Sequence, residues 1–174
     1  IVLEGLVSDI TDRKRAETER TQLAAIVENS SDAIVSRSLD GTILSWNAGA
    51  ERMLGYTAAE AIGQPLALIV PPDRLQNVGY FNERLRRGET IPDFETMRRH
   101  KDGHLIEVSA SMSPIRNEAG EIIGSATIVR DISALKRAER ELERKAALTA
   151  LLEALARAAN EATTPEAALR ACLE

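Results

Sequence analysis

The residues of this sequence that could serve acid–base or metal chemistry are few, and they stand at a turn. His100 and His104 are the two histidines, and they flank Lys101-Asp102-Gly103. Two imidazoles can share a metal ion, but two ligands do not make a tight site. We therefore expect both histidines to be exposed residues of a hairpin, with no metal bound.

The serines offer no enzyme nucleophile. Ser109, Ser111 and Ser113 alternate along a β-type run without an adjacent base. The sequence contains no Gly-x-Ser-x-Gly, P-loop or His-Glu-x-x-His motif. We expect no catalytic residue in this chain and predict that it is not an enzyme.

Composition narrows the class of protein. Of the 174 residues, 44% are hydrophobic and 28% are charged, which is typical of a soluble globular domain. A net charge of −5 and an aromatic content of 3% argue against a nucleic-acid partner. Cys172 is the single cysteine, so an internal disulfide is excluded and a cytoplasmic location is favoured. The sequence has no apolar run long enough to span a membrane.

An internal repeat indicates the domain organisation. Residues 7–19 and 129–141 are identical at eight of thirteen positions, and both contain Val-x-Asp-Ile followed by Thr or Ser. We expect residues 1–19 to be the tail of a preceding module with its linker helix, and residues 20–133 to be one complete module. The sequence starts without Met, and we expect it to be a piece of a longer protein, which disfavours a stand-alone binding protein.

Local patterns predict the elements of this module. A helix is expected over residues 12–29, and short strands over 33–36 and 42–46, joined by the Asp40-Gly41 turn. Three helices are expected in the insert after these strands, the first of them capped by Asn47. They are predicted at 48–54, 58–62 and 73–87.

The remainder is predicted to be β until a final helix begins. Three strands are expected at 91–100, 104–114 and 122–132, and tight turns between them make them antiparallel neighbours. Apolar residues alternate in the middle strand from Ile106 to Met112, so one face should pack on a core. A leucine stripe then predicts an amphipathic helix over 133–160. The chain is therefore α+β.

Several segments together resemble the PAS family. Residues 40–56, DGTILSWNAGAERMLGY, look like the opening of a PAS domain, and Ala61-Ile62-Gly63-Gln64 matches the next segment of such a domain. Lys101-Asp102-Gly103 and residues 120–124 resemble its later hairpins, and Asp131-Ile132-Ser133 resembles its exit motif. The resemblance covers residues 20–133.

The resemblance implies a fold and a role. The family has a five-stranded antiparallel sheet with helices on one face, here flanked by amphipathic helices at both ends. Its members serve as sensor or dimerisation modules of signalling proteins such as histidine kinases and cyclic-dinucleotide enzymes. Residues 134–160 would then be a signalling or coiled-coil helix. Residues 161–174 would start a following module, since their surroundings faintly resemble a GAF domain.

Family motifs also bear on cofactors. Leu66 stands where flavin photosensors have their reactive cysteine, and Asn77 stands where oxygen-sensing members have their axial histidine. We therefore expect neither a covalent flavin adduct nor haem. Non-covalent flavin, a small organic ligand and a pocket filled by its own side chains all stay open. The candidate pocket residues, which could equally be plain core, are Met53, Phe81, Phe94, Val108 and Met112.

The expected mechanism is mechanical. Asp131, Ile132 and Ser133 join the last strand to the exit helix, so an event in the sheet or pocket would reorient that helix in a homodimer. The dimer would form through helices 12–29 and 133–160. Adjacent PAS, GAF or kinase domains would be the partners. The alternative is a constitutive dimerisation spacer that binds no ligand.

Overall fold

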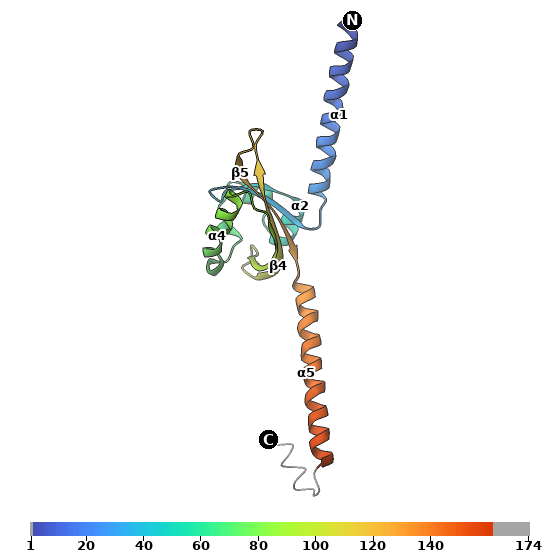
Figure 1. The fold of residues 1–174 in the computed structure, drawn as a ribbon, viewed down its shortest axis with the longest axis vertical. Helices are drawn as coiled ribbons and strands as arrows, with labels where there is room; N and C mark the ends of the chain where they lie inside the picture. The colour runs from blue at the N-terminus through green and yellow to red at the C-terminus, as the bar shows by residue number, and fades with distance from the viewer. Residues whose placement is uncertain (1, 162–174) are drawn as a thin grey trace. The chain divides into compact units, whose positions relative to one another are not determined.

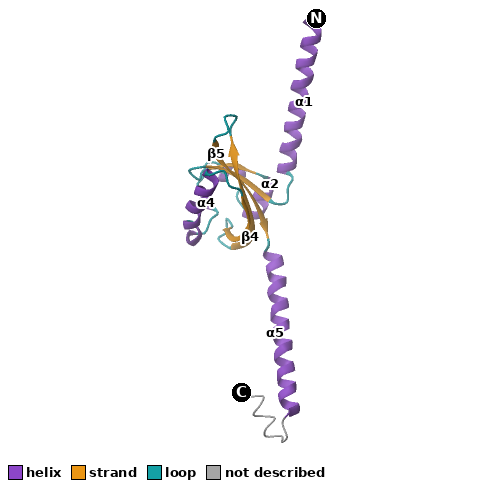
Figure 2. Cartoon of the chain, viewed as in Figure 1, coloured by secondary structure: helices purple, strands orange, loops and turns teal. Residues whose placement is uncertain are grey.

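The computed structural model describes residues 2–161, and the side chains among them from 14 to 158. Five helices and five strands are described in this range, and Figures 1 and 2 show how they follow one another along the chain. The helices are α1 (Val2–Glu28), α2 (Ala48–Leu54), α3 (Ala58–Ala61), α4 (Gln76–Arg86) and α5 (Ser133–Glu161). The strands are β1 (Ala33–Ser38), β2 (Ile43–Trp46), β3 (Ile91–Arg99), β4 (Leu105–Arg116) and β5 (Ile122–Asp131). Single 3-10 turns at Leu66–Leu68 and Pro72–Arg74 connect α3 to α4.

The strands form one antiparallel sheet in the order β2-β1-β5-β4-β3. The predicted hairpins are present, because Gly41 and Gly103 adopt the positive φ that their Asp-Gly turns require. Strand β5 pairs with β4 on one side and with β1 on the other, so the first and last strands of the domain are neighbours. The predicted α+β class with a five-stranded antiparallel sheet is confirmed.

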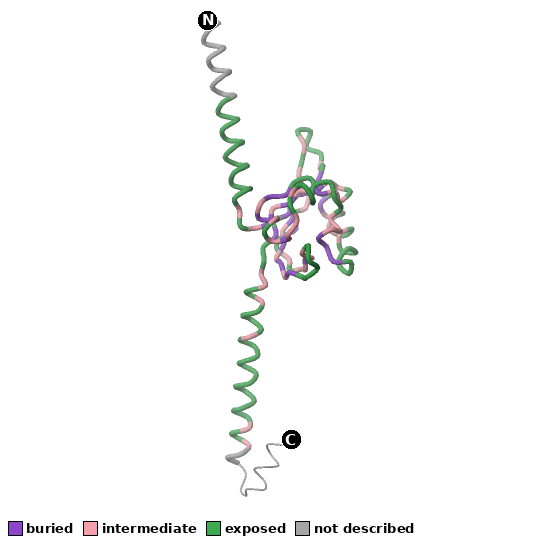
Figure 3. Tube along the Cα trace, turned by 180° about the vertical axis from the view of Figure 1, so that it is seen from behind, coloured by how far each residue is buried: buried purple, intermediate pink, exposed green. Residues whose placement is uncertain are grey.

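One face of the sheet carries the core. In β4 the side chains of Ile106, Val108, Ala110 and Met112 are buried, and the residues between them are not. The alternation predicted for this strand is therefore confirmed. Helices α2 and α4 both cover this face, since residues of each pack in hydrophobic clusters with these β4 side chains. Figure 3 shows burial concentrated within the sheet and its helical cover.

Two clusters divide this core. The larger one contains Leu54 of α2 together with residues of β1, β2, β4 and β5. The smaller one contains Leu85 from the end of α4, Ile91 and Met112, with Phe81 and Phe94 packed against it. The larger cluster lies under the α2 end of the sheet, and the smaller one lies under α4.

Asn47 fixes α2 against the sheet. Its side-chain oxygen accepts hydrogen bonds from the backbone N–H groups of Ala50 (2.9 Å) and Ile34 (2.8 Å), so it caps α2 as predicted and also holds β1. Its amide nitrogen donates to the carbonyls of Val27 (2.8 Å) and Asp32 (3.1 Å). The side chain is 1% exposed, and these four bonds use its full capacity.

Some element boundaries differ from the predicted ones. The helix expected over 73–87 is split into a 3-10 turn at Pro72–Arg74 and α4, which starts only at Gln76. Pro72 starts the 3-10 turn, where its fixed φ and missing N–H are tolerated, and the N–H of Leu75 donates to the Pro72 carbonyl at 3.3 Å in the three-residue pattern of such a turn. Helix α1 begins at Val2, well before the predicted residue 12.

The chain divides into two units, of which the first ends at Ile132 and the second begins at Ser133. The described part of the second unit is helix α5, which matches the predicted exit helix in extent. Along it, five leucines are each more than half exposed: Leu135, Leu142, Leu148, Leu151 and Leu152. The helix start predicted at Thr164 and the expected GAF-like segment lie outside the described residues.

Candidate functional site

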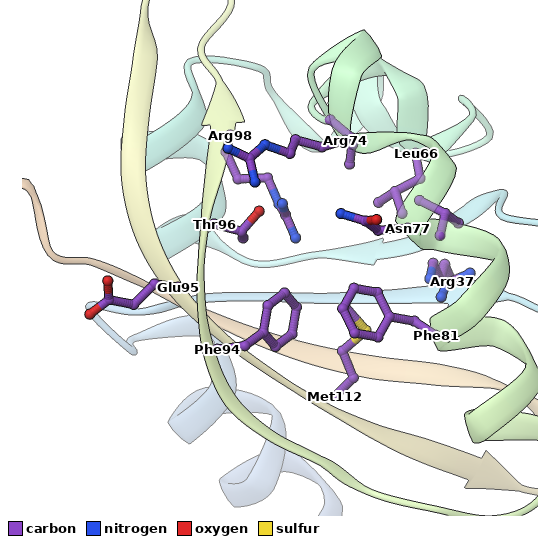
Figure 4. A pocket seen from close by; sticks show the side chains of 12 residues that line it. Arg37, Leu66, Arg74, Asn77, Phe81, Phe94, Glu95, Thr96, Arg98 and Met112 are labelled. Carbon is purple, nitrogen blue, oxygen red and sulfur yellow. The ribbon is translucent and has the colours of Figure 1, made fainter.

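A cavity of about 70 Å³ lies between α4 and the inner face of the sheet (Figure 4). One water needs about 10–15 Å³ of such space, so the cavity has room for several small atoms. Its walls come from β1, β3, β4, α4 and the turns that precede α4. The residues that line it are Arg37, Leu66, Val70, Arg74, Asn77, Val78, Phe81, Phe94, Glu95, Thr96, Arg98 and Met112.

Two arginines of the wall are buried. Arg37 is 2% exposed and Arg98 is 5% exposed. Arg37 donates from Nη2 to Oδ1 of Asn82 at 2.6 Å, and Arg98 donates from Nη1 to the carbonyl of Met97 at 3.0 Å. The Nε atom of each guanidinium is buried and has no hydrogen-bond partner.

Burial also affects the ionisation of both groups. It lowers the pKa of Arg37, and it lowers the pKa of Arg98 to about 10, with the Arg37 charge contributing to the second shift. Both groups still carry their charge at neutral pH. The protein therefore holds two positive charges beside one cavity, and low exposure weakens their screening by water.

Strand alternation explains how these arginines come to face inward. Arg37 follows the buried residues Ala33 and Val35 at two-residue spacing in β1. Arg98 likewise follows Phe94 and Thr96 in β3, and all three line the cavity. Neither arginine was predicted from the sequence, because the strand expected over 33–36 ends before Arg37, and a register shift between Ile91 and Phe94 breaks the two-residue spacing that leads to Arg98.

The five predicted pocket residues are only partly brought together. Phe81, Phe94 and Met112 line the cavity, and the rings of the two phenylalanines lie 4.7 Å apart between centroids. Val108 is fully buried in the larger hydrophobic cluster, and Met53 packs against that cluster. Neither of these two lines the cavity. A ligand-contacting role for the other three stays a prediction.

The residues at the cofactor positions also line the cavity. Leu66 offers no thiol and Asn77 offers no imidazole, so the wall has no group for a flavin adduct or for iron at either position. The cavity is also far smaller than the several hundred Å³ usual for sites that enclose molecules of that size. The residues present therefore do not fit either group.

The two histidines and Asp102 form a compact turn. Oδ1 of Asp102 lies 2.6 Å from Nδ1 of His104 and 3.0 Å from Nδ1 of His100, and the imidazole centroids are 4.5 Å apart. Among the described residues this is the group of three that could face one metal ion. Backbone N–H groups of the turn also hold these side chains, since that of Asp102 donates to Nδ1 of His100 at 3.2 Å and that of His104 donates to Oδ1 of Asp102 at 3.1 Å.

The predicted signal-transfer residues lie where the sheet ends. Asp131 is the last residue of β5 and pairs with Val108 of β4. The backbone N–H of Ile132 donates to the carbonyl of Glu107 at 2.9 Å, and Ser133 is the first residue of α5. Their role in signal transfer stays a prediction.

A family model described as PAS fold matches residues 21–132. The chain belongs to the PAS family. A crystal structure of a PAS domain from Colwellia psychrerythraea superimposes with a TM-score of 0.60 at 31% identity, covering 66% of this chain and 97% of that one. A PAS domain of an HTR-like protein from Haloarcula marismortui gives a TM-score of 0.61 at 28% identity, covering 70% and 98%. The family predicted from the sequence is confirmed.

Longer signalling proteins contain similar segments. The PAS chain is 30% identical over 151 residues to the signal transduction histidine-protein kinase AtoS of Escherichia coli, covering 87% of this chain and 24% of the kinase. It is 25% identical over 170 residues to the cyclic di-GMP phosphodiesterase PdeB of Shewanella oneidensis, covering 98% of this chain and 19% of that enzyme. The chain thus spans about a quarter or less of these relatives.

Homology of this kind supports a sensory role in signal transduction. PAS domains are regulatory modules, and related ones occur in sensor kinases. Within residues 2–161, no helix combines the length and the apolar composition that crossing a bilayer requires.

Proposed function

We propose that this PAS domain senses a ligand or a partner and relays the resulting change through α5 to a downstream output domain. The observation that carries the proposal is the direct succession of β5 and α5. Strand β5 is bonded to both β4 and β1, and only Ile132 separates it from the helix. A shift of β5 against its neighbours would therefore act at the start of α5.

The proposal includes a modular organisation. Residues 1–19 belong to a preceding PAS-like module and its linker, residues 20–133 are the sensory domain, and residues 134–160 are the signalling helix. Residues 161–174 begin the following module. The output domain is of the histidine kinase or cyclic-dinucleotide type, which is supported by the relatives that share this segment.

A homodimer through the flanking helices is the second part of the proposal. The exposed leucines of α5 support it, because a second copy of the same helix is an apolar surface on which they can be buried. The step from Leu135 to Leu142 is one heptad, whereas the step to Leu148 is six residues. The row of exposed leucines therefore shifts around the helix axis between Leu142 and Leu148.

Disulfide trapping tests the dimer and the relay together. In a Cys172→Ser background, Leu142→Cys should cross-link rapidly between copies, and its neighbour Glu143→Cys should cross-link slowly. Equal rates would contradict pairing along the leucine stripe. Under the relay, an input that binds the domain changes the Leu142→Cys rate, and an unchanged rate with the input bound would contradict the relay.

The alternative function is a constitutive dimerisation spacer. The exposed leucines support this as well, since they would pair the helices with or without a ligand. An absorption spectrum and a native mass of the purified chain separate the two functions. Colour or mass above that of the sequence supports a sensor, and a colourless protein of sequence mass favours the spacer.

A further inference from the structure

The cavity beneath α4 contains buried positive charge without a protein carboxylate to balance it. The ion pairs formed by the described residues do not include Arg37 or Arg98. Glu95 is the acidic residue of the wall, and Figure 4 shows its side chain extending away from the two guanidinium groups. Both arginines therefore keep hydrogen-bonding capacity for something other than a side-chain anion.

Missing hydrogen-bond partners are also evident at three buried polar atoms. They are Nε of Arg37, Nε of Arg98 and Oγ of Ser125, and none has a hydrogen-bond partner. Ser125 is the β5 residue paired with Arg37 in the sheet register. A buried donor without an acceptor costs free energy, more so when it is charged. Two such charges in one domain point to an occupant that accepts hydrogen bonds.

Polar and apolar side chains share the wall of the cavity. Figure 4 shows Arg98 and Thr96 toward β3, Arg37 apart from them on the α4 side, and the side chains of Phe94, Phe81 and Met112 close together. Asn77 and Thr96 add neutral hydrogen-bonding groups beside the guanidinium groups. A fitting occupant therefore has an anionic head and a short apolar body.

The volume of the cavity limits the size of its occupant. At about 10–15 Å³ per water-sized group, a cavity of about 70 Å³ holds on the order of five or six non-hydrogen atoms. A carboxylate matches a guanidinium by paired hydrogen bonds. An inorganic phosphate would match the arginines but would leave the phenylalanine side of the cavity without a contact.

We infer that the PAS cavity binds a short aliphatic carboxylate, with its head group on Arg98 and Arg37 and its hydrocarbon part against Phe81 and Phe94. This inference deepens the proposed sensory function, because it names the chemical class of the ligand at the same site. The proposed relay would stand with another input if the ligand class proved wrong.

Thermal unfolding of the full 174-residue chain tests the inference. Acetate, propionate and butyrate are compared with sodium chloride at equal ionic strength. We expect propionate to raise the unfolding midpoint by a few degrees in a saturable manner, and chloride to leave it unchanged. A midpoint that responds to none of the three carboxylates would overturn the inference.

Matched variants locate the binding. Arg98→Met and Arg37→Met should each weaken propionate binding, measured by titration calorimetry, by about tenfold or more because a charged hydrogen-bond donor is lost. Arg86→Met removes the same charge from an exposed position of α4 and should bind like the wild type. Equal weakening in all three variants would place the anion on the surface rather than in the cavity.

Two further outcomes separate this inference from the proposed function. Phosphate that binds as tightly as propionate would overturn the carboxylate class, since the apolar side would then contribute nothing. Propionate that binds the wild type, but leaves the Leu142→Cys cross-linking rate unchanged, would support the ligand class and contradict the relay.

Discussion

Asn47 and Arg98 are both buried polar side chains of the PAS domain, yet their surroundings differ. Asn47 makes four hydrogen bonds that join α2, β1 and the end of α1. Arg98 bonds the carbonyl of its own neighbour and leaves Nε without a partner. The α2 end of the domain is thus internally satisfied, whereas the α4 end keeps unused donors around a cavity. The first arrangement serves stability, and the second is suited to a ligand.

The largest effect is expected at Asn47. Asn47→Ala removes four hydrogen bonds and leaves the part-buried backbone N–H of Ile34 without its partner, so it should lower the free energy of unfolding by about 4 kcal/mol. Urea unfolding measures this loss. Asn117→Ala breaks similar bonds in an exposed turn and should cost about 1 kcal/mol or less. Equal losses would mean that the buried bonds of Asn47 stabilise the fold no more than the bonds of an exposed turn.

Helices α2 and α4 also differ in how closely their backbones pack against neighbouring residues. A Cβ at Gly49 of α2 would overlap the backbone carbonyl oxygens of Asp32 and Ser30, whereas one at Gly79 of α4 meets nothing within 4 Å. Gly49→Ala should therefore destabilise the domain by about 3 kcal/mol. Gly79→Ala should stabilise it by about 0.5–1 kcal/mol through helix propensity. Stabilisation by both in thermal unfolding would contradict tight packing at α2.

Removal of the Arg98 charge should change the free energy of unfolding in the opposite direction to Asn47→Ala. Arg98→Met replaces an unbalanced buried charge by an apolar side chain of similar length, so the ligand-free chain should gain about 1 kcal/mol in free energy of unfolding. Urea unfolding beside Arg86→Met, which should change little, measures the gain. A loss above about 1 kcal/mol would mean that Arg98 serves the fold as Asn47 does.

The smallest effect concerns the exposed hairpin turn. The pKa of Asp102 is lowered from 3.8 to about 2, chiefly because the backbone N–H of His104 donates to its carboxylate. A lowered carboxyl pKa stabilises the fold above the unfolded value, and this contribution is lost as pH falls toward about 2. Asp102→Asn should therefore lose less stability than the wild type on acidification through this range.

Acid unfolding followed by circular dichroism checks this expectation. Glu118→Gln, which removes an exposed carboxylate from the other long hairpin, is the matched control. If Asp102→Asn and the wild type lost stability in parallel below pH 3.8, the turn would contribute nothing to the acid response.

Much of the fold follows from local sequence chemistry. Asp-Gly turns, the Asn47 cap and the alternation of β4 depend on residues close in sequence, and all were predicted correctly. The strand order places β5 between β1 and β4, and this arrangement depends on contacts between distant residues that no local pattern contains. Strand parity alone likewise does not predict which face of the sheet Trp46 occupies. The structure buries it, and its Nε1 donates to the Tyr56 carbonyl at 2.9 Å.

The site was harder to predict than the fold. Phe81, Phe94 and Met112 were sought as apolar residues, and they do line the cavity. Arg37 and Arg98 were overlooked because arginine is rarely buried without a partner, so its type suggested a solvated position. Strand alternation did not reveal them either, because the predicted strand ended at residue 36 and β3 has a register shift between Ile91 and Phe94.

The most direct test observes the two guanidinium groups themselves. Nitrogen-15 NMR of the full chain labelled in its arginine side chains resolves Nε–H resonances, and single substitutions assign those of Arg37 and Arg98. We predict that propionate shifts these two resonances in a saturable manner and leaves that of Arg86 in place. Resonances of Arg37 and Arg98 that stay fixed while propionate is added would contradict an anion-binding cavity.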